Sequence, residues 1–145
     1  MKIANVSMLS FLVLVLFFGV QVSKADEEQN HLYEAAQANP ALKSAFEEII
    51  GPVVKESSWL KDYGTTAPST VEFIDDDEYD VYWGCKPKDC ISESYTVMYD
   101  PKSKKIVAGA LVRNTFDGPN VVAGEVTWLG EADWERAKVL GKYLY

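Results

Sequence analysis

The chain has 145 residues, with 22 acidic side chains, 14 basic side chains and a single histidine, which gives a formal net charge of −8. This balance argues against a nucleic-acid-binding protein, because such proteins present a basic surface. It favours a basic protein partner, which long-range attraction would draw in, although strong negative charge also simply keeps an exported protein soluble. The length suits one domain with a modest core.

Residues 1–25 have the pattern of an export signal. Lys2 supplies the positive end, residues 8–20 are almost wholly apolar, and residues 23–25 offer small side chains at the cleavage positions. The 13-residue apolar run is shorter than the roughly 20 residues of a membrane-spanning helix. We therefore expect cleavage before Asp26, which leaves residues 26–145 as a single domain of a periplasmic or secreted protein with 12 basic and 22 acidic side chains, a net charge of −10.

The start of this domain predicts helices. Residues 26–38 are polar and only weakly periodic, so we expect a short helix or a loose lead-in there, which contains the only histidine, His31. Asn39 and Pro40 are suited to cap and start a clear helix, and Gly51 with Pro52 should end it near Ile50. Its apolar residues recur at helical spacing: Leu42, Ala45, Phe46, Ile49, Ile50 and Val53.

The rest of the chain predicts strands followed by one more helix. Residues 59–63 read as a loop with an aromatic anchor, and five strands follow at residues 70–74, 78–83, 93–100, 105–112 and 121–129. Residues 131–143 look helical, with an apolar stripe formed by Trp134, Ala137, Leu140 and Leu144. Together these elements predict an α+β domain, with a central antiparallel sheet of about five strands flanked by helices.

The alternation in residues 93–100 indicates a strand with two different faces. Tyr95, Val97 and Tyr99 lie on one face, and Thr96 and Met98 lie on the other. The preceding strand runs directly into the segment that contains both cysteines. That segment is therefore expected to be a connection between two paired strands.

Cys85 and Cys90 are the only cysteines, so in an oxidising compartment we expect them to form a disulfide. Their spacing is neither the redox C-x-x-C pattern nor a zinc pattern, since zinc would require two more ligands and His31 is the only histidine. The bond closes a six-residue ring with charge on three of its four inner residues, which should project as a rigid, charged loop. A loop that is already ordered loses little entropy on binding, as in rigid inhibitors.

Signals for catalysis are weak. A Ser-His-Asp or Cys-His site needs a base beside the nucleophile, and the only histidine, His31, lies in the lead-in. No glycine-rich phosphate loop is present in the sequence either. The acidic run at residues 75–77 lacks the alternating ligands and central glycine of a calcium loop, so we read it as a solvated turn. A paired-carboxylate enzyme stays open, because separations between carboxylates cannot be read from sequence. We expect no enzyme activity, no cofactor and no metal.

The segment Trp83-Gly84-Cys85-Lys86-Pro87-Lys88-Asp89-Cys90, together with residues 59–64 and 127–129, resembles the Ivy family of bacterial inhibitors of vertebrate c-type lysozyme. The resemblance extends from the capped helix to Trp134. It implies an Ivy-like α+β fold, a periplasmic location, frequent pairing as homodimers, and insertion of the ring into the lysozyme cleft. The partner would be c-type lysozyme, and the inhibitory loop would consist of Cys85, Lys86, Pro87, Lys88, Asp89 and Cys90.

Lys88 departs from the family pattern Cys-Lys-Pro-His-Asp-Cys, in which the histidine reaches the two catalytic carboxylates of the enzyme. An ammonium between an acid and a nucleophile carboxyl would be attracted to both, by roughly 4 kcal/mol for charges about 4 Å apart at an effective dielectric of 20. On binding, lysine loses more rotamer freedom than histidine and must give up a tighter hydration shell, and both costs favour weaker inhibition.

Two alternatives to lysozyme inhibition remain at this point. In one, the chain is a paralogue without lysozyme inhibition, and Lys88 is an ordinary solvated lysine. In the other, it is a periplasmic binding protein that controls endogenous lytic transglycosylases. Of the remaining ring residues, Pro87 should fix the backbone, Lys86 should point aside into solvent, and Asp89 should accept N–H groups within the ring in preference to pairing with a basic residue of lysozyme.

Overall fold

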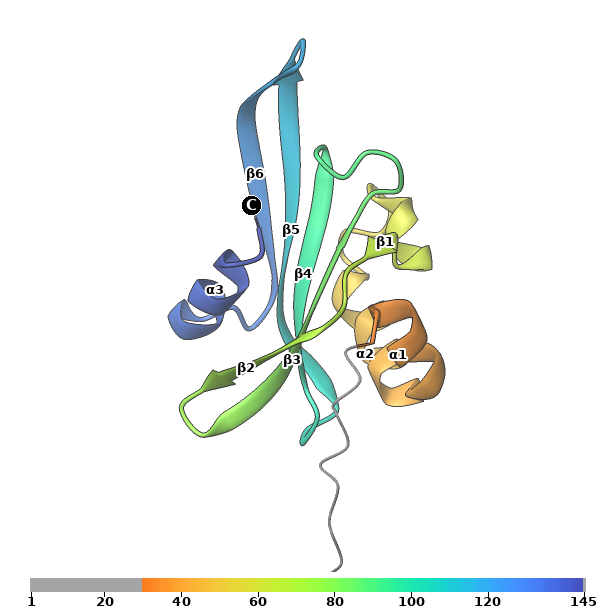
Figure 1. Cartoon of the computed structure of the whole chain (residues 1–145), viewed down its shortest axis with the longest axis vertical. Coiled ribbons are helices and arrows are strands. Elements are labelled where there is room, and N and C mark those ends of the chain that lie inside the picture. The colour runs from red at the N-terminus through yellow and green to blue at the C-terminus, as the bar shows by residue number, and fades with distance from the viewer. Residues whose placement is uncertain (1–29, 145) are drawn as a thin grey trace, which may run out of the picture.

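The computed structural model describes residues 30–144, so the predicted export signal at residues 1–25 and its cleavage site lie outside the described residues. Within residues 30–144, none of the helices is long and apolar enough to cross a membrane. In chain order (Figure 1) the elements are α1 (Leu32–Ala38), α2 (Pro40–Ile50), the short 3₁₀ helix η1 (Ser58–Asp62), β1 (Thr65–Thr66), β2 (Thr70–Ile74), β3 (Asp77–Cys85), β4 (Glu93–Asp100), β5 (Lys105–Asp117), β6 (Asn120–Gly130) and α3 (Trp134–Gly141).

The strands form one antiparallel sheet, which confirms the predicted α+β fold. The order is β1-β3-β4-β5-β6, and β2 pairs with the first half of β3. The described residues form six strands and not five, because the two-residue strand β1, which sequence periodicity did not reveal, pairs with the end of β3. β3, β5 and β6 are also longer than predicted, since β3 continues to Cys85, β5 to Asp117 and β6 to Gly130.

Both faces of the sheet are covered, as Figure 1 shows: α1 and α2 lie on one side and α3 on the other. The alternation predicted for β4 is confirmed, because Tyr95, Val97 and Tyr99 belong to the core under α1 and α2, whereas Met98 belongs to the core under α3. All six interior residues of β4 are buried. β4 is therefore the central strand of the domain.

α2 begins and ends as predicted. The Asn39 side chain accepts hydrogen bonds from the backbone N–H groups of Ala41 and Leu42, at 3.1 and 3.3 Å, and so caps the helix. The helix ends at Ile50, before Gly51 and Pro52, and its buried residues are Leu42, Ala45, Phe46 and Ile50.

The stripe predicted for α3 is wrong at Trp134, which is 77% exposed. Asp133 caps the helix by accepting a hydrogen bond from the Arg136 backbone N–H at 3.0 Å, so Trp134 is the first helical residue. The buried residues of α3 are Val139 and Leu140. Five and six residues at 3.6 residues per turn place these two on the opposite side of the helix from Trp134.

The β5–β6 hairpin extends beyond the rest of the sheet (Figure 1). Arg113 of β5 pairs with Glu93, the first residue of β4, and also with Glu125 of β6. Beyond this point, residues 114–124 have strand partners only across the hairpin. We call residues 114–125 the arm. Gly118 has φ 58°, the positive φ that a tight two-residue hairpin turn requires.

Candidate functional site

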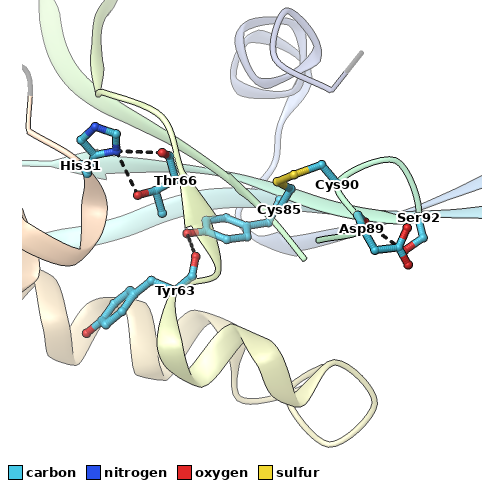
Figure 2. Close-up of a disulfide and its surroundings, with 8 residues drawn as sticks. His31, Tyr63, Thr66, Cys85, Asp89, Cys90 and Ser92 are labelled. Carbon is cyan, nitrogen blue, oxygen red and sulfur yellow. Dashed lines mark hydrogen bonds between the residues drawn. A yellow bond between two sulfur atoms is a disulfide. The ribbon is translucent and has the colours of Figure 1, made fainter. Parts of the chain in front are cut away.

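The predicted disulfide is present and joins two different environments (Figure 2). Cys85 is the last residue of β3 and is fully buried, whereas Cys90 lies in the following loop and is exposed. Their Cα atoms are 4.8 Å apart. The bond therefore ties an exposed loop to the end of a core strand.

The tip of the ring is a tight turn. The Asp89 backbone N–H donates a hydrogen bond to the Lys86 carbonyl at 3.0 Å, so residues 86–89 form a β-turn with Pro87 at its second position. Lys88, at the third position, has φ 66°, which identifies the turn as type II. Glycine or asparagine usually occupies that position, since a left-handed backbone costs other residues about 1–2 kcal/mol. Pro87 and Lys88 are the exposed tip.

Lys86 is not the solvated charge that the sequence predicted. Its Nζ lies 3.4 Å from Oε1 of Glu93 and 3.6 Å from Oδ2 of Asp89. The Asp89 carboxylate thus pairs with Lys86 across the turn. The prediction that it accepts backbone N–H groups within the ring is wrong, because no such hydrogen bond is present among residues 30–144. Among residues 30–144, Lys88 has no ion-pair partner, which makes it the one uncompensated charge of the ring.

Glu93, directly beneath the ring, organises its base. Its Oε2 accepts hydrogen bonds from the Ser57 hydroxyl at 2.5 Å and the Trp59 indole N–H at 3.1 Å, and Arg113 Nε lies 3.9 Å away. Burial by itself would raise the pKa of the Glu93 carboxyl, but the hydrogen bonds from Ser57, Trp59 and Lys86 outweigh burial and leave this pKa below its ordinary value. Sequence reasoning missed this network, although it identified Trp59 as an anchor.

Two glycines allow the ring to sit close to the core. Gly84 faces Tyr95 across the β3–β4 pair, and a Cβ on Gly84 would lie 2.6 Å from atoms of the Tyr95 side chain. The Tyr95 hydroxyl donates a hydrogen bond to the Tyr63 carbonyl at 2.8 Å. Gly64, at φ 68°, lies against the Cys85 carbonyl oxygen and would clash with it if it carried a Cβ. The absence of a Cβ at Gly84 and Gly64 therefore permits the close packing at the end of β3, where the ring begins.

The C-terminal side of the ring is fastened to β5. Asn114 donates its backbone N–H to the Ser92 carbonyl at 2.8 Å and its side-chain amide to the Ile91 carbonyl at 2.7 Å. The Ser92 hydroxyl in turn donates to the Asp89 carbonyl at 3.1 Å (Figure 2). A groove with a volume of about 500 Å³ adjoins this side, and its lining includes Trp83, Cys90, Ile91, Asn114, Val121 and Tyr143.

A family model described as "Inhibitor of vertebrate lysozyme (Ivy)" matches residues 41–134, which is more than half of the chain. The chain belongs to the Ivy family. Two curated relatives, both named "Inhibitor of vertebrate lysozyme" and from Escherichia coli strains K12 and O157:H7, are each 30% identical to it over 91 residues. The match covers 63% of this chain and 55% of each relative, so the chain spans about half the length of the curated relatives it matches.

The position that departs from the ring pattern expected from the family resemblance, Lys88, is one of the exposed residues at the tip of the turn. Lys88 occupies the third position of the type II turn, and the rest of the ring keeps the pattern described above. The ammonium replaces an imidazole at the tip, while the anchoring residues around Glu93 remain below it.

His31 has a structural position away from the ring. It precedes α1 and forms a bridge with Pro68, and its Nδ1 lies 2.7 Å from the Thr66 carbonyl oxygen (Figure 2). Of the predicted lead-in, the described part forms this bridge and the helix α1. Among residues 30–144, no three His, Cys, Asp or Glu side chains lie close enough together to hold a metal ion. Asp77, from the acidic run considered for calcium, forms an ion pair with Lys102 at 2.6 Å.

Proposed function

We propose that this Ivy-family protein is an exported inhibitor of c-type lysozyme, which it blocks by inserting the ring closed by Cys85 and Cys90 into the catalytic cleft. The observation that carries the proposal is Lys88, an exposed cation without an ion-pair partner in residues 30–144, at the tip of a turn that is held from both sides. The names of the matched relatives support lysozyme as the target.

The chemistry of the target suits a cation. A retaining glycosidase presents two carboxyl groups about 5 Å apart, one as acid and one as nucleophile. An ammonium that reaches between them gains roughly 4 kcal/mol for each charge about 4 Å away, before the loss of hydration is subtracted. Because the Lys86 charge is compensated by Glu93 and Asp89, Lys88 is the residue of the ring that can supply this attraction.

The fold reduces the cost of insertion. Pro87 restricts the backbone at the tip, the disulfide closes the loop, and Glu93 fixes Lys86 at its base. A loop that is ordered before binding loses less conformational freedom in the complex. The predicted net charge of −10 for residues 26–145 would also speed association with a basic enzyme.

The test is a turbidity assay in which purified protein is titrated against a basic c-type lysozyme acting on bacterial cell walls at low salt. We expect protection near stoichiometric amounts, and we expect Lys88→Ala to raise the inhibition constant about tenfold, the scale of one lost charged contact.

Lys104→Ala is the matched control for this assay. Lys104 is also exposed and also has a positive φ, 58°, but it lies in the turn after β4, at the end of the strand away from the ring. The Lys104→Ala variant should inhibit lysozyme as well as the unmodified protein does. Absence of any protection at stoichiometric excess would refute lysozyme as the target.

A further inference from the structure

The ring alone is too small to form a stable interface. Its exposed residues are Pro87, Lys88 and Cys90. Stable protein complexes bury about 800 Å² on each partner, contributed by roughly 20 residues a side. An enzyme seated on the ring must therefore contact surface beside it.

The groove between the ring and the arm is the adjoining surface with the composition of an interface. Ile91, next to the ring, is 68% exposed, and Val121, on the arm, is 53% exposed. Both line the groove, together with Trp83 and Tyr143. The two hydrogen bonds from Asn114 hold the ring and β5 in a fixed relation, so the groove lies at a fixed distance from the tip.

The charge on the arm differs in sign from the charge at the tip. The charged residue that lines the groove itself, Lys142, is paired with Glu72 at 2.7 Å. Between Arg113 and Arg136 the chain has no basic side chain but five acidic ones: Asp117, Glu125, Glu131, Asp133 and Glu135. Asp117 and Glu125 lie on the arm, are exposed, and have no ion-pair partner among residues 30–144. A basic enzyme with an acidic cleft presents the complementary arrangement, since its cleft would meet Lys88 and its outer surface would meet the arm.

We propose that the groove between the ring and the arm is a second contact surface for the same basic lysozyme, which places an apolar side chain between Ile91 and Val121. This inference rests on the proposed function and extends it, because it assigns the arm a role in affinity. The arm projects from the same end of the sheet as the ring (Figure 1), so one partner can touch both.

Adjacent valines on β6 provide a matched test. Val121 lines the groove, whereas Val122 is 59% exposed and does not line it. Val121→Lys and Val122→Lys make the same change in net charge one residue apart, so their general electrostatic effects are equal. We expect Val121→Lys to raise the inhibition constant about tenfold or more and Val122→Lys to change it less than about threefold. Circular dichroism melts establish that both variants fold.

Equal effects of the two substitutions, in a protein whose inhibition depends on Lys88, would overturn this inference and leave the proposed function intact. If the unmodified protein does not inhibit lysozyme, both proposals fail. The other possible occupant of the groove is a second copy of this chain, and light scattering tests it by measuring the oligomeric state. If Val121→Lys abolishes pairing between copies without changing inhibition, the groove is a contact between copies and the inference is wrong.

Discussion

Replacement of Lys88 by glycine should make the protein more stable and a weaker inhibitor at the same time. Lys88 has φ 66° at the third position of a type II turn, where the left-handed backbone costs a residue with a Cβ about 1–2 kcal/mol. Glycine removes this cost, but it also gives the unfolded chain more conformational freedom, which lowers stability by about 0.4–1 kcal/mol. The expected net gain is therefore about 0.5–1 kcal/mol, or a few degrees in melting temperature for a domain of this size.

Lys88→Ala separates the two effects, because alanine removes the ammonium but keeps the Cβ. Both variants should lose about tenfold in inhibition, as expected for one charged contact, while only the glycine variant melts at a higher temperature. Lys104→Gly is the control for the backbone effect. It removes a lysine with φ 58° from the turn after β4, so it should gain similar stability without any loss of inhibition.

Thermal unfolding followed by circular dichroism gives the stability of each variant, and the turbidity assay gives the inhibition constant. A Lys88→Gly variant that melts no higher than Lys88→Ala would show that the turn does not hold position 88 in the left-handed region. A Lys88→Gly variant that inhibits as well as the unmodified protein would refute the role of the ammonium.

Three further predictions concern the base of the ring. Glu93→Gln should lower the free energy of unfolding by about 1–3 kcal/mol at pH 7. Because folding lowers the pKa of Glu93, its carboxylate contributes this stability above the unfolded pKa and loses it as the pH falls through the folded pKa, so the difference between the two proteins in urea denaturation should shrink from pH 7 to pH 3. A difference of the same size at pH 3 would contradict this assignment. Gly84→Ala should cost about 1–3 kcal/mol, since the added methyl meets the Tyr95 ring, and urea midpoints equal to those of the unmodified protein would count against that packing. Reduction of the Cys85–Cys90 bond should lower stability by only about 2 kcal/mol and leave the far-ultraviolet spectrum unchanged while inhibition weakens; undiminished inhibition by the reduced protein would show that closure of the ring is not needed.

Local sequence patterns were sufficient for several elements. The cap at Asn39 and the start at Pro40 depend on adjacent residues, so α2 was predicted with its observed bounds. The bounds of β4 and the division of its side chains between two cores followed from simple alternation. The disulfide followed from the presence of only two cysteines in a chain expected to be exported.

The features that were missed depend on contacts between distant parts of the chain. Glu93 is 36 residues from Ser57 and 34 from Trp59, and nothing in the sequence near Lys86 indicates that these residues converge beneath it. The length of the arm was missed for a related reason, because polar residues such as Asn114 interrupt the apolar pattern and their strand structure comes from pairing with β6. The sequence places Trp134 in the buried stripe because its side chain is apolar, but which side of the helix faces the sheet depends on tertiary packing, and Trp134 lies on the exposed side.

The position of each surface in the sheet implies a difference in stiffness between the ring and the arm. The ring begins at the last residue of β3 and is followed, after residues 91 and 92, by β4, whose interior residues are all buried. β6, in contrast, is an edge strand with most of its residues exposed. Amide hydrogens of β4 should therefore exchange with deuterium only when the whole domain unfolds, while those of residues 120–125 should exchange through local opening. An inhibitor built in this way would contact its enzyme through a rigid ring and a more flexible arm. Differences in surface shape among lysozymes would then be accommodated by movement of the arm and not of the ring.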